Sequence, residues 1–514
     1  MTAQRIAIVG GGHNALVAAA YLARAGREVT VLERLDHVGG AAVSERAFAG
    51  VDASLSRYSY LVSLLPQRIV DDLGLSIRLA RRRYSSYTPV PGERTGLLID
   101  RADARATDAS LRTIAGRGDT RRWQRFGERL ERLAAAVFPT MTEPLPLRAE
   151  LAAAVDDEEL WTGLAERPIG ELIEGGFRSD LVRGVVATDA LIGTFAALDD
   201  PALAQNRCFL YHVIGGGTGE WNVPIGGMGA VTAELERAAR RAGAMIVTGA
   251  EVTAIDPDGA VTYRHGEAEH RLGADRILAG VAPAVLERLV TGAATSEPEG
   301  AQVKVNLLLR RLPRLREPGV DARAAFSGTF HVNEGYEQLG RAHAAAAAGT
   351  VPEPLPLEVY CHSLSDPSIL APRLREAGAH TLTAFGLHTP HRLARQHGPE
   401  RLRRELGRAV VASLESVLDE PLADVLLTDE HGLPCIETKT TADLERDLGM
   451  AGGDIFHGGL DWPFLEAPAE STAERWGVAS GWDRVLLCGS GSRRGGGVSG
   501  LGGHSAAMAV LEGA

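Results

Sequence analysis

Four residues near the start of the chain have the types and spacing of a nucleotide-binding turn. Gly10, Gly12 and Ala15 occupy the three positions of a G-x-G-x-x-G/A pattern. The first position allows a tight turn, the second lets the backbone approach a pyrophosphate, and the third lets a helix pack closely on a strand. Glu33 follows at close to the interval of about 20 residues at which an acid accepts hydrogen bonds from ribose hydroxyls. Together these residues predict dinucleotide binding.

Lys304 is a second candidate for chemistry, because it and Lys439 are the only lysines among 54 basic residues. It lies in the apolar stretch QVKVNLLL, where strand alternation places Lys304, Asn306 and Leu308 on one face. A compact ammonium on a flexible stem can hold a water molecule against a cofactor, which a planar guanidinium could not do in the same space. The alternative is a strand-end lysine that reaches solvent. We interpret Lys439 as a surface residue beside a helix start.

Histidines are a third group, since imidazole titrates near neutral pH and could act as a base. The candidates in the presumed substrate domain are His331, His362, His380, His388 and His391. Their spacing matches no metal-binding motif, so we predict no metal site and interpret each one as structural. His504 lies in a C-terminal glycine loop, where helix capping explains it equally well.

Periodicity indicates the elements that must position the glycines. Arg5 to Val9 predicts a buried parallel strand, Leu16 to Ala23 a helix, and Glu28 to Leu32 a second strand entered through Gly26. This is a βαβ unit, whose helix N-terminus offers free N–H groups to a pyrophosphate. An ordinary glycine-rich turn is the alternative, but strand, helix, strand and acid together favour the dinucleotide.

Two further glycine-rich segments suggest a long cofactor held from two sides. In HVGGAAVSE, residues 37–45, Gly39 and Gly40 permit a second close backbone approach. The C-terminal stretch WDRVLLCGSGSRRGGGVSGLGGHSAAMAVL predicts a strand over Val485 to Cys488, then a glycine loop that begins at Gly489, then a small-residue helix. This is a second strand-to-helix turn, at the opposite end of the chain.

These motifs resemble the phytoene desaturase branch of the FAD-dependent amine-oxidase superfamily. The resemblance is carried by the N-terminal fingerprint, the Gly39-Gly40 doublet, WNVPIGGMGAVTAELERAARRAGAMIVTGAEVTAI and GGGVSGLGGHSAA. Within that branch, FHVNEGYEQLGRAH, SLSDPSILAP and TTADLERDLGMAGGDIFHG are similar to the group of pyridine nucleotide-disulfide oxidoreductase domain-containing protein 2. The resemblance runs from residue 5 to the C-terminus, is weakest around 90–210, and implies non-covalent FAD.

The fingerprint and the resemblance together predict these FAD-binding residues: Gly10, Gly12, His13, Asn14, Ala15, Glu33, Arg34, Gly39, Gly40, Ala41, Gly226, Gly227, Met228, Val252, Gly489, Gly497, Val498 and Gly500. The position of Val252 contacts the adenine side through its backbone in relatives. Lys304 is similar in strand context to a lysine that amine-oxidase relatives place, through a water, at flavin N5. Relatives usually carry His-Pro where this chain has Arg493-Arg494, a departure that puts the role of that imidazole in doubt.

The expected fold class is α/β, with a doubly wound Rossmann-type FAD domain interleaved with a mixed-sheet substrate domain that carries a helical cap. Residues 1–60, 215–295 and 470–514 form the FAD domain, and residues 61–214 and 296–469 form the substrate domain. We expect 61–214 to be poor in strands, with a helix over Asp119 to Phe138. We expect Met228 to Gly243 to be a helix followed by one strand, MIVTGAEVTAI.

Composition fits a soluble enzyme of 514 residues, with 45% hydrophobic and 23% charged residues. A net charge of −12 argues against nucleic acid as a partner, and we interpret Arg81 to Arg83 as a solvated strand edge. The four cysteines form no C-x-x-C pair and are interpreted as core residues. No signal peptide or apolar run of about 18 residues is present, so we expect no transmembrane segment and a cytoplasmic location.

The sequence thus predicts an FAD-dependent oxidoreductase that dehydrogenates or desaturates an apolar or amphipathic small molecule by hydride transfer to flavin. A flavin amine oxidase, a redox-neutral isomerase and a flavin-binding protein that acts through partners are the alternatives. Only Arg493-Arg494 favours the last of these. The identity of the substrate, the electron acceptor (oxygen or a quinone-like compound) and the oligomeric state stay open.

Overall fold

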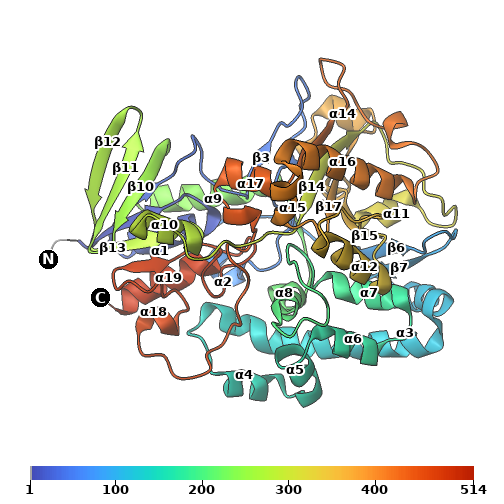
Figure 1. Ribbon diagram of the computed structural model, residues 1–514, viewed down its shortest axis with the longest axis horizontal. Helices are drawn as coiled ribbons and strands as arrows, with labels where there is room; N and C mark the ends of the chain where they lie inside the picture. The colour runs from blue at the N-terminus through green and yellow to red at the C-terminus, as the bar shows by residue number, and fades with distance from the viewer. Residues whose placement is uncertain (1–2, 514) are drawn as a thin grey trace.

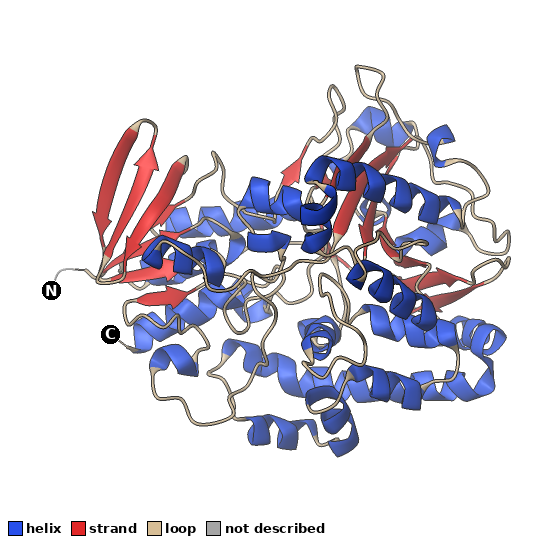
Figure 2. Cartoon of the chain, viewed as in Figure 1, coloured by secondary structure: helices blue, strands red, loops and turns tan. Residues whose placement is uncertain are grey.

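The computed structural model describes residues 3–513 and contains two large sheets with a helical region beneath them (Figures 1 and 2). The first sheet is entirely parallel. Its five strands, in spatial order, are β19 (Val485–Leu487), β13 (Arg276–Ala279), β1 (Arg5–Val9), β2 (Glu28–Leu32) and β9 (Met245–Val247). The predicted bounds of β1 and β2 are confirmed.

Alternate residues of β1 bury against different layers. Ile6 and Ile8 pack on a helical layer, whereas Ala7 and Val9 pack on the opposite side. The helical layer contains α1 (His13–Arg24), α2 (Gln67–Leu73), α9 (Met228–Arg241), α18 (Thr472–Arg475) and α19 (Leu501–Glu512). The other side is covered by α10 (Pro283–Thr291) and by an antiparallel sheet of β10 (Ala250–Asp256), β11 (Ala260–His265) and β12 (Ala268–Gly273). This sheet stands at one end of the molecule in Figure 2.

The second large sheet has seven strands and is mixed. All its pairs are antiparallel except that of β15 with β6. Its strands, in spatial order, are β18 (Ile436–Lys439), β14 (Val303–Leu309), β17 (His380–Gly386), β16 (Leu357–Tyr360), β15 (Thr329–Val332), β6 (Tyr84–Pro89) and β7 (Gly96–Asp100). The helices beside it are α11 (Ala322–Ser327), α12 (Tyr336–Ala347), α13 (His362–Ser365), α14 (Pro372–Glu376), α15 (His391–His397), α16 (Pro399–Glu415) and α17 (Thr441–Leu448).

A helical cap lies below both sheets in Figure 1. It consists of α3 (Ala104–Val137), α4 (Arg148–Val155), α5 (Glu158–Ala165), α6 (Ile169–Gly176), α7 (Asp180–Thr188) and α8 (Ala204–Val213). The helix predicted over Asp119 to Phe138 lies within α3 up to Val137, and Phe138 begins a 3-10 helix. α3 is interrupted at Gly116, where φ is 75°. The cap shares one hydrophobic core with residues such as Leu339 and Phe385 of the mixed-sheet region.

Short elements complete the chain. Two small antiparallel pairs join β3 (Ser44–Glu45) to β4 (Leu55–Ser56) and β5 (Leu79–Ala80) to β8 (Val223–Pro224). The 3-10 helices are η1 (Phe138–Thr142), η2 (Gly215–Gly217), η3 (Pro367–Ile369), η4 (Leu422–Asp424) and η5 (Ala451–Gly453).

The parallel sheet and the mixed sheet draw their strands from interleaved parts of the chain. Every strand of the parallel sheet lies within 1–60, 215–295 or 470–514, and every strand of the mixed sheet lies within 61–214 or 296–469. The exact domain boundaries stay a prediction. The expectation that 61–214 is poor in strands is confirmed, because only β5, β6 and β7 lie there. The sequence did not predict that the hairpin of β6 and β7 completes the mixed sheet.

Three other expectations are corrected. The single strand expected after α9 is two strands in different sheets, β9 and β10, because the chain turns at Gly249 with φ of 66°. Arg82 does not lie at a solvated strand edge, because it is buried and donates a hydrogen bond to the carbonyl of Trp221. Arg81 and Arg83 form ion pairs at the surface. Lys439, which was interpreted as a surface residue, is also buried.

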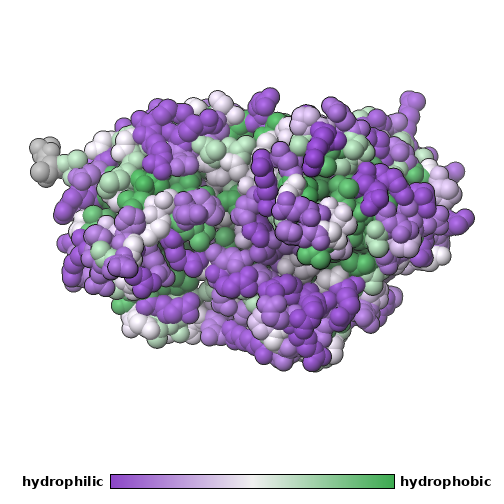
Figure 3. Space-filling view, turned by 90° about the horizontal axis from the view of Figure 1, so that it is seen from above, coloured by the Kyte–Doolittle hydropathy of each residue, from purple (hydrophilic) through white to green (hydrophobic). Residues whose placement is uncertain are grey.

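The cysteines and the surface agree with the sequence. All four cysteines are free and buried: Cys208, Cys361, Cys435 and Cys488. The face seen in Figure 3 shows hydrophilic side chains interspersed with hydrophobic ones. Within residues 3–513, none of the helices combines the length and the apolar character needed to cross a bilayer.

Candidate functional site

One cavity of about 860 Å³ runs from the parallel sheet to the mixed sheet and the cap. At one end it is lined by residues that follow the carboxyl ends of four parallel strands: Gly10 after β1, Glu33 after β2, Gly280 after β13 and Gly489 after β19. In open α/β sheets this edge is where ligands bind. The other end is lined by the cap and by strands of the mixed sheet.

The glycine turn has the geometry that the sequence predicts. Gly10 has φ of 89°, which only glycine adopts without strain. The backbone N–H of Gly11 donates to Glu33 Oε2 at 2.6 Å, and the N–H of Leu35 donates to Glu33 Oε1 at 2.8 Å. The Glu33 carboxylate therefore joins the end of β2 to the turn while it lines the cavity.

The space beside Gly12 indicates whether the turn can accept a ligand. Its φ of −68° is ordinary for any residue, and a Cβ built on it would meet no atom of the protein within 4 Å. Neither backbone strain nor protein packing therefore requires a glycine here. The open space beside Gly12 belongs to the cavity, as expected where a pyrophosphate approaches the backbone at a helix N-terminus.

The C-terminal glycine loop closes over the same turn. His13 Nε2 lies 3.0 Å from the carbonyl oxygen of Gly497, and Asn14 Nδ2 donates to the carbonyl of Gly495 at 3.1 Å. Burial lowers the pKa of His13 to about 4, so its imidazole is neutral at neutral pH. The buried Oδ1 of Asn14 has no hydrogen-bond partner among the described residues, which leaves a polar atom for a ligand.

Most of the predicted FAD-binding residues line the cavity. They are Gly10, Gly12, His13, Asn14, Ala15, Glu33, Arg34, Gly40, Ala41, Val252, Gly489, Gly497 and Val498. Val252 lies at the end where Glu251 and Arg288 also line the cavity. The cofactor contacts themselves stay predictions.

Two of the predicted residues, Gly39 and Gly500, contact the glycine turn or the helix that follows it. The N–H of Gly39 donates to the carbonyl of Gly11 at 2.9 Å, and Gly39 has φ of 122°. Gly500 precedes α19 with φ of 73°, and a Cβ there would lie 3.0 Å from Val17 of α1. Neither residue lines the cavity, and the contact of each with FAD stays a prediction.

Gly226, Gly227 and Met228 also lie away from the cavity. The N–H of Gly226 donates to Asp366 Oδ2 at 2.7 Å. Gly227 begins α9 with φ of 75°, and a Cβ there would meet Ser44 Oγ at 2.5 Å. Met228 is fully buried in the core of the first domain. These residues fix the start of α9, and their contact with FAD stays a prediction.

Lys304 lies behind the cavity wall. It is buried on β14, and its Nζ donates to the carbonyl oxygens of Ser56 at 2.6 Å and Tyr58 at 3.0 Å. The ammonium also lies 4.9 Å from the ring centre of Tyr60. Burial moves the pKa of Lys304 well below its usual value. Because 58–61 lines the cavity, Lys304 fixes a cavity wall, and its catalytic role stays a prediction.

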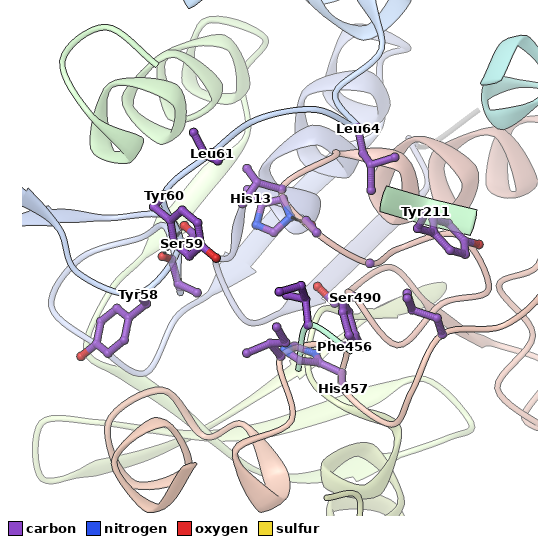
Figure 4. A pocket seen from close by; sticks show the side chains of 18 of the residues that line it. His13, Tyr58, Ser59, Tyr60, Leu61, Leu64, Tyr211, Phe456, His457 and Ser490 are labelled. Carbon is purple, nitrogen blue, oxygen red and sulfur yellow. Dashed lines mark hydrogen bonds between the residues drawn. The ribbon is translucent and has the colours of Figure 1, made fainter. Parts of the chain in front are cut away.

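Figure 4 shows lining residues that sequence reasoning missed. They come from segments far apart in the chain: Tyr58, Ser59, Tyr60, Leu61, Leu64, Tyr211, Phe456, His457 and Ser490. Phe456, His457 and Ser490 lie in stretches quoted for the resemblance or the glycine loop, but no motif singles out these side chains. Five of these lining residues lie in the stretch YSYLVSLLP, residues 58–66, whose aromatic residues could have indicated a cavity wall.

A buried acid–base cluster lies at the far end of the cavity. His331 on β15 is the cross-strand partner of Glu358 on β16, and both line the cavity. His331 Nδ1 is hydrogen-bonded to Glu334, and the hydroxyl of Tyr360 donates to Glu358. Ligand atoms of His331, Glu334 and Glu358 lie within 4.8 Å of one another, a grouping that their spacing in sequence did not predict. Of the five histidines considered from sequence, only His331 lines the cavity.

Burial sets the charge of this cluster. It raises the pKa of Glu358 to about 8 and of Asp189 to about 6, and it raises that of Glu334 well above its usual value. It also lowers the pKa of His331. Burial therefore disfavours the charged forms of both His331 and Glu334.

The Arg493-Arg494 departure has a structural explanation. Arg494 is buried, and its guanidinium donates to the carbonyls of Thr140 and Glu143 and to Ser505 Oγ. Arg493 donates to the carbonyl of Phe464. Neither arginine lines the cavity. Arg494 ties the C-terminal loop to the segment between α3 and α4, and Arg493 ties it to the loop after η5.

The parallel sheet, the mixed sheet and the cavity between them define the fold of an FAD-dependent oxidoreductase. A family model described as an NAD(P)-binding Rossmann-like domain matches residues 8–67. The chain belongs to the same family as uncharacterized protein Rv0897c of Mycobacterium tuberculosis, with 55% identity over 98% of this chain and 96% of that protein. It is also homologous to pyridine nucleotide-disulfide oxidoreductase domain-containing protein 2 of Mus musculus, with 29% identity over 98% of this chain and 93% of that protein.

Solved structures share the fold. A putrescine oxidase variant matches with a TM-score of 0.59 and 17% identity over 99% of each chain. Cyclohexylamine oxidase from Brevibacterium oxydans IH-35A matches with a TM-score of 0.55 and 16% identity, over 100% of this chain and 99% of that one. The predicted fold class is confirmed, and so is the predicted similarity to pyridine nucleotide-disulfide oxidoreductase domain-containing protein 2.

Proposed function

We propose that the protein is an FAD-dependent oxidoreductase that dehydrogenates an apolar or amphipathic small molecule. The observation that supports this most directly is the single cavity, which continues from the dinucleotide turn into a space lined by apolar and acid–base groups. FAD supplies the acceptor for the two electrons of a hydride when it is bound. The protein holds it, aligns the substrate and excludes water.

The residues that would hold FAD are those of the two glycine turns. The turn at Gly12 and the N-terminus of α1 would accept the pyrophosphate, and Glu33 would accept hydrogen bonds from the adenosine ribose. Gly497 and Val498 would approach from the opposite side. Because Gly12 has room for a ligand and Asn14 Oδ1 has no partner among residues 3–513, the residues present fit a dinucleotide.

The cap supports the substrate class. Trp123, Phe126 and Leu130 of α3 line the cavity together with Val185 of α7 and Phe209 of α8. Such a wall favours an apolar body, while the acid–base cluster at its end favours a polar or reactive group. The combination supports an amphipathic substrate.

The alternative that the protein acts only as a flavin-binding module loses its single support. That alternative rested on Arg493-Arg494, and both arginines bond to backbone carbonyls outside the cavity. We therefore favour an enzyme.

The test begins with the purified protein. Released cofactor should be FAD by chromatography, and the holoenzyme should then be mixed anaerobically with long-chain alcohols, isoprenoids, and primary and secondary amines. We expect at least one compound to bleach the flavin spectrum. Bleaching by amines alone would favour an amine oxidase, and product isomers without net bleaching would favour an isomerase. A protein without FAD, or one that no compound reduces, would contradict the proposal.

A further inference from the structure

Glu358 is an acid of the buried cluster that is almost fully enclosed by protein and yet lines the cavity. Its side chain lines the cavity from β16, although only 4% of the residue is exposed. The hydroxyl of Tyr360 donates to its carboxyl group. The ring of Tyr360 in turn lies 4.7 Å, centre to centre, from that of Tyr60, in the wall next to the dinucleotide end. Glu358 therefore connects the substrate end of the cavity to the cofactor end.

The groups that face Glu358 come from several elements. They are Glu334 and His331 from β15 and the turn after it, Tyr360 from β16, Asp189 from the end of α7, Arg82 from the segment before β6, and Tyr60 from the first domain. Arg82 is held by the carbonyl of Trp221 and by Thr329 Oγ1. Its positive charge favours the ionised form of Glu358, whereas Glu334 and Asp189 oppose it.

Dehydrogenation needs a proton acceptor as well as a hydride acceptor. The substrate loses one hydrogen with both electrons of its C–H bond and loses the other, from the neighbouring atom, as a proton. The electron pair of this second bond becomes the new double bond. Resting on the function proposed above, we propose that Glu358 is the catalytic base that accepts this proton on a carboxylate oxygen, and that the His331–Glu334 pair positions it.

Geometry favours Glu358 over the other acids at this end. Glu334 does not line the cavity, and its free Oε1 is enclosed by protein. Asp189 lines the cavity but projects from the cap, whereas Glu358 is held on a strand between Tyr360 and His331. A base on a rigid strand with fixed neighbours keeps its orientation. A pKa of about 8 also lies close to a neutral working pH, as a general base requires.

The first experiment uses the panel compound that bleaches the wild-type flavin fastest. Holoenzymes of the wild type, Glu358→Gln and Glu376→Gln are mixed with it anaerobically from about pH 6 to about pH 9. We expect flavin reduction by the wild type to rise with an apparent pKa near 8, and Glu358→Gln to be slower by about a hundredfold or more, with no such rise. Glu376 is exposed on α14, so Glu376→Gln controls for the substitution itself.

Two further variants test the assignment within the cluster. Glu334→Gln should shift the midpoint of the pH profile while the limiting rate stays within a few-fold, because a positioning residue sets the pKa of its neighbour. Asp189→Asn should keep the rise near pH 8. If Asp189→Asn removes the rise and Glu358→Gln keeps it, the base is Asp189 and the inference is overturned.

A second experiment needs no substrate. Because burial raises the pKa of Glu358 from 4.5 to about 8, the folded protein binds a proton that the unfolded chain releases between these pH values. Stability should therefore fall as pH rises through this window. The thermal midpoint of Glu358→Gln should fall less steeply than those of the wild type and Glu376→Gln. Equal slopes would overturn the inference.

The outcomes separate the two proposals. A wild type that no compound reduces contradicts the proposed function, and with it the role of Glu358. A wild type that is reduced at the same rate and with the same pH profile as Glu358→Gln overturns only the inference. Elemental analysis of purified protein completes the test, since a stoichiometric metal lost in Glu358→Gln would make the cluster a metal site and overturn the role as base.

Discussion

Glu33 accepts a 2.6 Å hydrogen bond from the backbone N–H of Gly11, so the acid expected to read a ribose also shapes the glycine turn. The same carboxylate accepts the N–H of Leu35 with its other oxygen. Each oxygen keeps a further lone pair for a ligand, because a carboxylate offers about four acceptor sites.

Glu33→Ala should therefore weaken FAD more than FMN, because FMN has no adenosine ribose to hold. We expect the dissociation constant of FAD to rise by about tenfold or more, since hydrogen bonds to a charged group contribute about 1.5–3 kcal/mol. Titration of the apoprotein with each flavin measures this. Glu28→Ala, at the exposed start of the same strand, is the control. Equal losses for FAD and FMN would remove Glu33 from the ribose role.

Gly12→Val should give a folded protein without FAD. The new side chain would occupy open cavity and strain neither the backbone nor a protein neighbour. Flavin absorbance after gel filtration and the thermal midpoint of the apoprotein are the two measurements. Gly175→Val, which also points into open space but lies on the cap helix α6, should keep its FAD. Full FAD occupancy in Gly12→Val would contradict the assignment of this turn.

Lys304→Met should lower the thermal midpoint, because it leaves the buried carbonyls of Ser56 and Tyr58 without their donor, at about 1–3 kcal/mol for each. If Lys304 also holds a water at the flavin, reoxidation by oxygen should slow by about a hundredfold while reduction by substrate changes less. Stopped-flow measurement of both half-reactions separates the roles. Lys439→Met, which removes the partner of Asp447, is the matched control. Unchanged reoxidation would leave Lys304 with a structural role only.

Arg494→Lys should destabilise the protein without changing its flavin spectrum. Burial lowers the pKa of the Arg494 guanidinium to about 10, so it is charged at neutral pH, and its fork spans carbonyls that a single ammonium cannot reach together. We expect the free energy of unfolding to fall by about 3 kcal/mol or more, and thermal unfolding measures this change. Arg493→Lys, at a less buried neighbour, should cost less. Loss of FAD in Arg494→Lys at a temperature where it stays folded would indicate a direct role in the site.

Local patterns predicted the first βαβ unit closely, because hydrophobic alternation and glycine geometry both act within a few residues. The bounds of β1 and β2 and the turn at Gly10 followed from these rules. The hairpin of β6 and β7 was missed, since β6 is stabilised by pairing with β15, more than 200 residues away in sequence. Tertiary pairing overrides weak local propensity in such strands.

Site residues divide in the same way. Glu33 was predicted because its spacing from Gly12 is a local property of one βαβ unit. Glu358 was not, because nothing near it in sequence announces that β16 will bring it beside His331. Lys304 was noticed for its rarity, but only the contact with Ser56 and Tyr58 indicates that it supports the cavity wall.

The parallel sheet also determines when the folding chain can complete its strand pairing. Ile6 pairs with Arg276, and Ile277 pairs with Val485, so the central strands must wait for partners from distant parts of the nascent chain. Pairing over such separations closes large loops and is slow. A chain released from the ribosome before Val485 lacks both the edge strand and the glycine loop of the cofactor cleft. Under the proposed function, we expect such a chain to bind no FAD.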